Sequence, residues 1–147
     1  MSSLARVDRT FRLFAYGSLL RGERDHDVLA GAEELGVART RTEYYLVELT
    51  AFPALVAGGK LTVVGELYRI DVPTLLKADI RKEHPKLFQR QTIVLDDGEP
   101  AEAYLMGLEQ VRGRRRLKVG DWRRRFEPLS SPLPKSPWSH WARDRFK

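Results

Sequence analysis

The alternation of hydrophobic and polar positions along this chain predicts a protein built mainly from short strands. Most apolar residues fall in short runs that are rich in β-branched and aromatic types and are bounded by Gly, Pro or charged residues. Predicted strands cover 11–16, 52–56, 61–70, 87–95 and 101–108. Two more strands lie within 34–49 and are separated by a bend around 40–43. Gly65 interrupts one of them, which is typical of a bulge or of another backbone passing close by. The last two are joined through Asp96-Asp97-Gly98, a strong hairpin signal.

The segment from Asp71 to Glu83 has the one clear helical pattern of the chain. Pro73 suits the first turn of a helix, and Pro85 ends it. The apolar residues spaced for one buried face are Leu75, Leu76 and Ile80. A shorter helix is expected from Asp25, acting as its N-cap, to about residue 31.

These elements predict an α+β domain, because strands and one main helix occur without regular alternation. The sheet is expected to be mixed or largely antiparallel and to curl into a small β-barrel. We expect a flexible leader over 1–10, the folded domain over 11–126, and a tail over 127–147 that is rich in Pro and Ser and then aromatic. The aromatic end of the tail is expected to pack on the domain or on a second copy, which would give a homodimer.

The composition narrows the class of protein. With 147 residues, of which 42% are hydrophobic, the chain can form one domain with a real core. It has no cysteine, which excludes disulfides and thiolate metal sites, and His26, His84 and His140 are too far apart for a local metal motif. No apolar run reaches the roughly 18 residues of a membrane span, and residues 1–10 have no signal-peptide pattern. We expect a cytoplasmic protein without a metal.

The net charge of +6 is concentrated near the end of the chain. The segment 112–125 holds eight basic residues and one acid, Asp121, so the rest of the chain is close to neutral at −1. A stripe of this kind can bind phosphates, but the body of the domain lacks a basic field. A polyanion partner is therefore the least favoured hypothesis, and no nucleic acid is expected.

The segment Tyr16-Gly17-Ser18-Leu19 follows the first predicted strand and is the first candidate for a site. Gly17 permits backbone angles that other residues avoid and lets a ligand approach the main chain. Behind it, the amides of Ser18 and Leu19 are placed to act as paired donors for a carboxylate or a developing oxyanion. The alternative is an ordinary turn between a strand and a loop.

Seven short motifs occur in order along the chain. They are Phe14-Ala15-Tyr16-Gly17-Ser18-Leu19, Tyr45-Leu46, Phe52-Pro53-Ala54-Leu55-Val56, Val64-Gly65-Glu66-Leu67-Tyr68, His84-Pro85-Lys86-Leu87-Phe88-Gln89-Arg90, Ala103-Tyr104 and Gly120-Asp121-Trp122. In this order and spacing they resemble the gamma-glutamylcyclotransferase-like superfamily, particularly its AIG2-like and gamma-glutamylamine cyclotransferase branch. The resemblance covers roughly 11–122 and rests on the set of motifs, since none of them is diagnostic alone.

The resemblance implies a small mixed barrel and a cofactor-free reaction. In that reaction the α-amine of a γ-glutamyl group attacks its own γ-carbonyl, closes 5-oxoproline and expels the amine partner. Holding the chain folded lowers the barrier to ring closure, a proton must be removed from the ammonium, and the oxyanion needs donors. The residues expected to contact the substrate are Tyr16, Gly17, Ser18 and Leu19 in the loop, and Phe88 and Arg90 after the helix.

The chain departs from the family where the resemblance implies the general base. The family has a glutamate at the helix end in a pattern like Leu-Asp-x-x-Glu-Gly-x-Pro-x-x-Tyr-x-Arg. A gapless match puts Lys82 on that glutamate and Glu83 on the glycine, with Phe88 in place of the tyrosine. Either the helix end has shifted and Glu83 serves as the catalytic base, which we favour, or the base has been lost. In the second case the pocket binds without cyclising, or does other chemistry with Lys82, Glu83 or His84.

Three functions are compatible with these observations. The first is a gamma-glutamylcyclotransferase acting on a γ-glutamyl amine, dipeptide or capped metabolite. The second is a binding module of the same fold that recognises a small carboxylate or a partner protein without turnover, and the third is polyanion binding through Arg112 to Arg125. Glu66 is either a second acid of the cavity or a structural residue held by hydrogen bonds.

Overall fold

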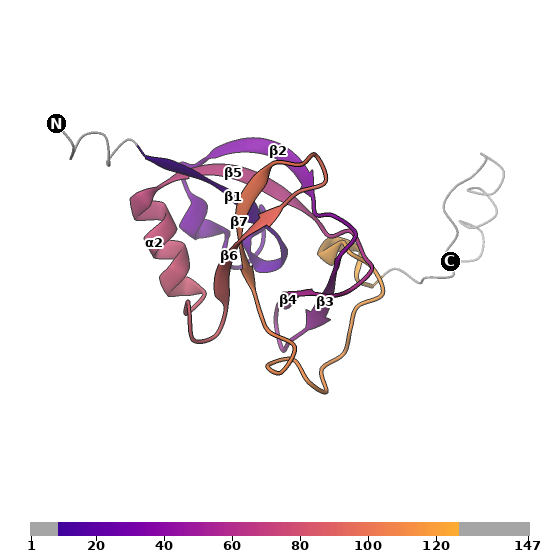
Figure 1. Cartoon of the computed structure of the whole chain (residues 1–147). Coiled ribbons are helices and arrows are strands. Elements are labelled where there is room, and N and C mark those ends of the chain that lie inside the picture. Colours follow the sequence, from indigo (N-terminus) through magenta and orange to yellow (C-terminus); the bar gives the residue numbers. More distant parts are fainter. Residues whose placement is uncertain (1–8, 127–147) are drawn as a thin grey trace, which may run out of the picture.

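The computed structural model of the chain describes residues 9–126 (Figure 1). Its strands are β1 (Thr10–Ala15), β2 (Glu33–Arg39), β3 (Tyr44–Glu48), β4 (Pro53–Ala57), β5 (Val64–Asp71), β6 (Gln89–Val94) and β7 (Pro100–Leu105). The one α-helix among the described residues is α2 (Val72–Arg81), and short 3₁₀ turns cover Gly17–Leu19, His26–Leu29 and Trp122–Arg124. The helix predicted from Asp25 is thus a single 3₁₀ turn.

The strands form one mixed sheet in the order β2-β5-β1-β7-β4-β3, with β6 also paired to β7. At its centre, β1 runs antiparallel to β5, where Leu13 lies opposite Tyr68, and parallel to β7, where Leu13 lies opposite Glu102. This confirms the predicted α+β class with a mixed sheet and one main helix. The order does not return from β3 to β2, so the sheet is not closed and is a barrel only in a loose sense.

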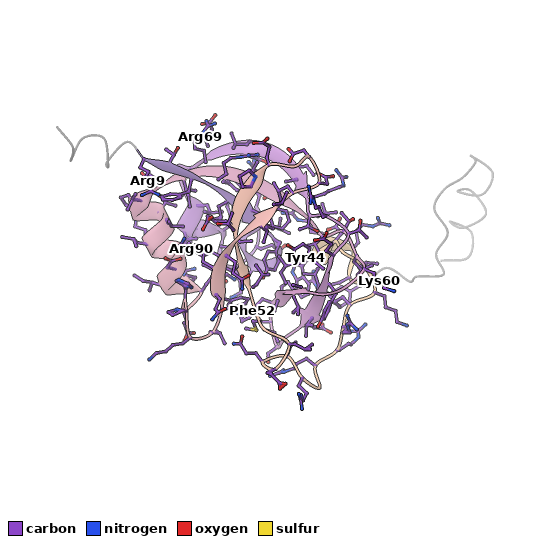
Figure 2. The ribbon with its side chains drawn as sticks, viewed as in Figure 1. Arg9, Tyr44, Phe52, Lys60, Arg69 and Arg90 are labelled. Atoms are coloured by element: carbon purple, nitrogen blue, oxygen red, sulfur yellow. The ribbon has the colours of Figure 1, made fainter. Side chains whose placement is uncertain are left out.

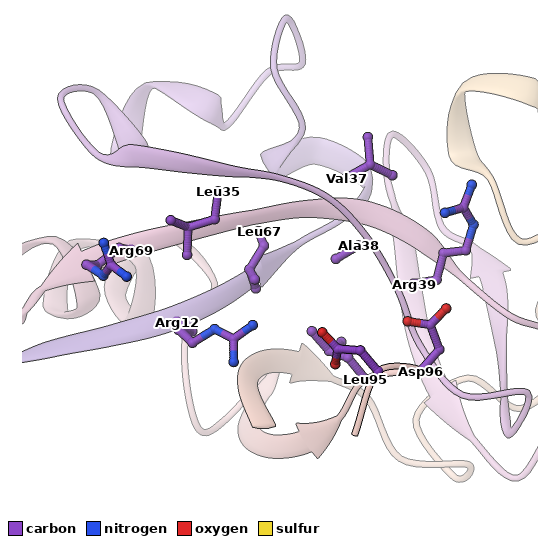
Figure 3. Close-up of a pocket in the computed structure, with 10 residues that line it drawn as sticks. Arg12, Leu35, Val37, Ala38, Arg39, Leu67, Arg69, Leu95 and Asp96 are labelled. Carbon is purple, nitrogen blue, oxygen red and sulfur yellow. The ribbon is translucent and has the colours of Figure 1, made fainter. Parts of the chain in front are cut away.

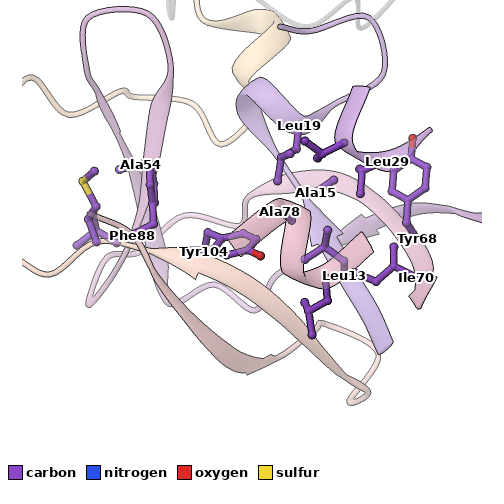
Figure 4. Close-up of a cluster of buried hydrophobic side chains, with 14 of the residues drawn as sticks. Leu13, Ala15, Leu19, Leu29, Ala54, Tyr68, Ile70, Ala78, Phe88 and Tyr104 are labelled. Atoms are coloured by element: carbon purple, nitrogen blue, oxygen red, sulfur yellow. The ribbon is translucent and has the colours of Figure 1, made fainter. Parts of the chain in front are cut away.

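Strand β1 is buried on both faces, which explains its continuous apolar sequence. Successive side chains of a strand point to opposite faces, so Leu13 and Ala15 join one buried cluster and Phe14 and Tyr16 the other. The first cluster also contains Ala78 of α2 and is drawn in Figure 4. The loop that follows β1 is consequently anchored to the core of the molecule.

Helix α2 begins as predicted, but the face it buries differs from the prediction. The Asp71 carboxylate accepts a hydrogen bond of 2.9 Å from the Thr74 amide, as an N-cap does. Leu75 is buried, whereas Leu76 and Ile80 are 54% and 77% exposed, so the predicted buried face is wrong for these two residues. The buried residues of α2 are Leu75 and Ala78, and Lys82 follows on the same face just beyond the helix.

Gly65 lies where two backbones approach each other. The strand predicted over 61–70 begins at Val64, and a Cβ at Gly65 would come 2.3 Å from the carbonyl oxygen of Ala15. This confirms the close approach, while the shift of register falls between Glu34 and Gly36 of β2 instead. Gly65 therefore allows β5 to lie against the end of β1, next to the candidate site.

Residues 1–8 and 127–147 lie outside the described part of the chain. The predicted leader, the predicted tail and the homodimer contact expected of that tail therefore stay predictions. Among residues 9–126, no helix is both long and apolar enough to cross a membrane.

Candidate functional site

The loop after β1 makes a 3₁₀ turn whose first residue must be glycine. Gly17 has φ of 59°, and a Cβ at this position would come 2.4 Å from Cγ of Pro53. The Leu19 amide donates to the carbonyl of Tyr16 at 3.2 Å, so the prediction that it serves as an outward donor is wrong. The turn leaves the amides of Gly17 and Ser18 unused, because they precede its first hydrogen bond.

Three polar side chains meet at this turn, two from the loop after β1 and one from the end of α2. The Lys82 ammonium nitrogen (Nζ) donates to the Ser18 hydroxyl at 2.6 Å and lies 3.6 Å from Oδ2 of Asp25. Ser18, Asp25 and Lys82 are respectively 2%, 7% and 6% exposed. We call these three residues the Lys82 cluster.

Aromatic rings cover the Lys82 cluster. The Nζ of Lys82 lies 5.3 Å from the centre of the Phe52 ring and 4.9 Å from that of Phe88. Burial in these surroundings lowers the pKa of Lys82 to about 8, although the nearby Asp25 carboxylate favours the charged form. Lys82 can therefore lose its proton near neutral pH, which an ordinary surface lysine cannot do.

Asp25 remains a carboxylate in this environment. Burial raises the pKa of Asp25, but hydrogen bonds from Ser18 and Arg81, together with the charges of Lys82 and Arg24, hold it below its ordinary value. Arg81 Nη1 donates to Asp25 at 3.1 Å, and its guanidinium also binds Asp27 through two hydrogen bonds of 2.9 Å. The cluster thus consists of an anion, a hydroxyl and a lysine that can titrate.

Glu83, expected to be the catalytic base, does not lie in the cluster. It is exposed and has φ of 53°, in the left-handed region that favours glycine. This is the conformation expected if Glu83 occupies the position of the family glycine, as the gapless match has it. On the same match, Lys82 occupies the position of the family glutamate, and the structure places Lys82 against Ser18.

Arg90, which is labelled in Figure 2, was expected to bind a substrate carboxylate. Acidic residues of the protein hold it instead. Its guanidinium binds both oxygens of Asp79, at 2.9 and 3.2 Å, and Glu102 at 2.9 Å. The Tyr104 hydroxyl also donates to Asp79, at 2.7 Å. The structure brings Phe88 to the Lys82 cluster, whereas Arg90 serves to connect α2, β6 and β7.

Tyr16 and Glu66 are fixed by hydrogen bonds next to the turn. The Tyr16 hydroxyl donates to the carbonyl of Tyr104 at 2.5 Å and accepts from the Leu55 amide at 2.9 Å. Burial raises the pKa of Tyr16 far above the neutral range. Tyr16 thus supports the turn by holding the strands around it, and Glu66 does the same through the hydrogen bonds that it accepts.

Glu66 accepts three hydrogen bonds. The donors are the Arg21 amide and the Tyr68 hydroxyl, each at 2.9 Å, and Arg123 at 3.1 Å. Burial raises the pKa of Glu66, but these donors outweigh it and keep the pKa below its ordinary value. These contacts support the structural alternative for Glu66 over a role as a second acid.

Most of the basic residues in 112–125 have partners inside the protein. Arg112 pairs with Glu109 and Arg115 with Glu48, and the guanidinium of Arg116 lies 3.6 Å from the centre of the Tyr45 ring. Arg123 binds Glu66, and Arg125 Nη1 donates to the Trp122 carbonyl at 2.7 Å. The stripe is therefore mainly used to hold the last described segment to the domain, which argues against a polyanion site.

A groove of about 480 Å³ lies between β2, β5 and the β6–β7 hairpin (Figure 3). Its lining contains Leu35, Leu67 and Leu95, three arginines (Arg12, Arg39 and Arg69) and two aspartates (Asp96 and Asp97). Both signs of charge are present, and the groove shares no residue with the Lys82 cluster. We assign it no role in the chemistry.

The sequence predicted the turn and Phe88 but missed Asp25 and Phe52 as parts of the site. Asp25 was expected to cap a helix, and its side chain makes no capping bond. The spacing of Leu75, Ala78 and Lys82 on one helix face was the signal that could have placed Lys82 in the interior. It competed with the equally regular spacing of Leu76 and Ile80, which the structure leaves exposed.

Comparison with known proteins identifies relatives over most of the domain. The family model described as "Gamma-glutamyl cyclotransferase, AIG2-like" matches residues 13–124. A Vibrio cholerae protein named "Putative gamma-glutamylcyclotransferase" is 37% identical over 110 residues, which cover 75% of this chain and 93% of the relative. "Gamma-glutamylaminecyclotransferase A" of Danio rerio is 34% identical over 106 residues, covering 63% of this chain and 66% of the relative.

A solved structure supports the same grouping. The solution structure of protein ytfP from Escherichia coli superimposes with a TM-score of 0.61 at 34% sequence identity, covering 76% of this chain and 95% of that protein. The range matched by the family model, 13–124, includes the turn after β1, α2 and the strands that surround the Lys82 cluster.

Proposed function

Because the chain belongs to the gamma-glutamyl cyclotransferase, AIG2-like family, we propose that it cleaves γ-glutamyl compounds by cyclisation. The substrate is a γ-glutamyl amine, dipeptide or capped metabolite, and the products are 5-oxoproline and the free amine. The α-amine nitrogen bonds to the γ-carbon while the bond to the leaving amine breaks. The reaction needs no cofactor, since the nucleophile is part of the substrate.

The observation that carries this proposal is the buried Lys82 beside the Gly17 turn. In its neutral form Lys82 takes a proton from the substrate ammonium, and as an ammonium it returns a proton to the leaving nitrogen. Its pKa of about 8 suits both steps near neutral pH. Lys82 thus performs the proton transfers that the family assigns to a glutamate.

The turn supplies donors for the charge that develops on the substrate. The amides of Gly17 and Ser18 are left unused by the turn, and donors fixed in advance stabilise an oxyanion without reorganisation. The Ser18 hydroxyl, held between Lys82 and Asp25, keeps the Lys82 nitrogen at this end of the site. Phe52 and Phe88 limit the access of water.

The first experiment is to incubate the protein with a panel of γ-glutamyl amines and dipeptides and to measure 5-oxoproline. With Lys82 as the base, kcat/KM should rise about tenfold per pH unit up to about pH 8 and then level off. A carboxylate base titrates several units lower and would give no such rise. Release of 5-oxoproline from none of the compounds, with the protein folded, would sink the proposal.

Three variants separate Lys82 from Glu83 as the base. Lys82→Met should abolish turnover, and Lys77→Met, an exposed lysine of the same helix, is the matched control and should not. Glu83→Gln should keep most of the activity, because the Glu83 side chain is exposed. An inactive Glu83→Gln with an active Lys82→Met would return the role of base to Glu83.

Binding without turnover is the second candidate function, and the charge of Lys82 favours it. With a pKa of about 8, about nine in ten Lys82 side chains carry a proton at pH 7, and an ammonium beside Ser18 can bind a carboxylate. Lys82→Arg distinguishes the two functions, since arginine keeps the charge but does not give up a proton. If calorimetry finds γ-glutamyl compounds bound equally well by both proteins, and neither releases 5-oxoproline, the binding function holds.

A further inference from the structure

We propose that an apolar groove beside the Lys82 cluster binds the leaving half of the substrate, and that this half is an amino acid with a large apolar side chain and a free carboxylate. The inference rests on the proposed function and names its substrate class: γ-glutamyl dipeptides whose second residue resembles leucine, methionine or phenylalanine. The groove has a volume of about 410 Å³. It is lined by Leu49, Thr50, Phe52, Leu87, Met106, Gln110 and Arg114.

Phe52 connects the groove to the site. One residue serves as a wall of both, because Phe52 lines the groove while its ring centre lies 5.3 Å from Nζ of Lys82. Leu87 is also in the lining, directly before Phe88, whose ring lies 4.9 Å from the same nitrogen. A γ-glutamyl group held at Lys82 therefore has this groove next to it for its amine half.

The lining selects an apolar side chain. Leu49, Phe52, Leu87 and Met106 come from three separate segments and present carbon and sulfur to the same space. The Gln110 side chain holds the neighbouring loops in place, since it donates to the carbonyl of Leu87 at 2.7 Å and accepts from the amide of Gly107 at 2.9 Å. An apolar side chain loses water contact on entering such a groove, which is favourable.

Arg114 supplies the charge that recognises a carboxylate. Its neighbours Arg112 and Arg115 form ion pairs, and the guanidinium of Arg116 lies over Tyr45. Within residues 9–126, no ion pair or hydrogen bond occupies the guanidinium of Arg114, which lines the groove. A guanidinium at the edge of an apolar groove matches the α-carboxylate of an apolar amino acid.

Turnover of matched substrates tests both halves of the inference. kcat/KM for γ-glutamyl-leucine should exceed that for γ-glutamyl-alanine at least about tenfold, because the groove removes the extra apolar carbons of leucine from water. It should exceed that for the γ-glutamyl amide of 3-methylbutylamine, which lacks only the carboxylate, about fivefold. Arg114→Gln should bring the second ratio to about one, while the control Arg112→Gln should leave it unchanged. Ratios near one in the unchanged protein would overturn the inference.

A binding measurement tests the groove even if no compound is turned over. Free leucine is titrated into the full ¹⁵N-labelled chain at millimolar concentration, with glycine and 3-methylbutylamine as matched probes. Leucine should shift the amide signals of Met106, Gln110 and Arg114 more than either probe, and Arg114→Gln should remove this difference. Shifts elsewhere, no shifts at all, or contacts from residues 127–147 to the Met106 methyl group would overturn the inference. The last result would assign the groove to the tail.

Discussion

Replacing Lys82 with methionine should abolish turnover and, at pH 7, make the protein more stable. Burial lowers the pKa of Lys82 from its ordinary value of 10.5 to about 8, so the folded state disfavours the ammonium form. A difference of this size corresponds to about 3 kcal/mol of stability that the folded protein lacks below pH 8. Methionine has a similar shape and carries no charge, so it removes this cost.

The net gain should be smaller than the full electrostatic cost. Lys82→Met removes the donor to Ser18 and the cation near Asp25, although Asp25 still accepts a hydrogen bond from Arg81. The loss of a hydrogen bond is worth about 1 kcal/mol, which leaves an expected gain of about 2 kcal/mol at pH 7. For a domain of this length, that gain raises the unfolding temperature by roughly 5 °C.

The pH dependence identifies the cause of the gain. Between about pH 8 and 10.5 the unfolded chain binds more protons at Lys82 than the folded one, so the stability of the unchanged protein rises with pH in this window. The advantage of Lys82→Met should therefore shrink as the pH rises from 8 towards 10.5. Urea unfolding followed by circular dichroism at pH 7 and 9.5 measures it, with Lys77→Met as the control. A variant that is less stable at pH 7, with the same difference at pH 9.5, would refute this reasoning.

Three other substitutions should also change stability. Gly17→Ala should cost at least about 2 kcal/mol, because a Cβ at φ 59° would come 2.4 Å from Cγ of Pro53; the urea midpoint measures this loss, and an unchanged midpoint would contradict the assigned turn. Glu83→Gly should raise stability by about 1 kcal/mol, since φ of 53° favours glycine, and a lower unfolding temperature would argue against this. Glu66→Gln should make the free energy of unfolding depend less on pH in the acid range. The Glu66 carboxylate has a lowered pKa, so it stabilises the folded state at pH values above the ordinary glutamate pKa. This stabilisation is lost as the pH falls through the pKa that Glu66 has in the folded state. Denaturant unfolding from pH 6 to 2 should show a shallower slope for this variant, and equal slopes would contradict the assignment.

The sequence by itself determined the elements whose causes are local. Asp71 and Pro73 start α2 because one accepts a hydrogen bond from the first turn and the other lacks a donor that the turn cannot use. Gly98 permits the turn between β6 and β7, with φ of 87°. Seven ordered motifs were enough to indicate the family, which the matching family model shows.

The tertiary structure alone decided which charged side chains enter the site. Lys82 and Ser18 are 64 residues apart in the sequence, and no local pattern says that their side chains meet. Lys82 and Glu83 are equally polar, but the backbone at Glu83 turns its side chain outward while the preceding residue follows the buried face of α2. From the sequence, Arg90 could bind a substrate, but in the folded chain Asp79 and Glu102 lie beside it and form ion pairs with it. The physical reason is that burial and ion pairing depend on neighbours that are distant in sequence, whereas turns and caps depend on neighbours in the chain.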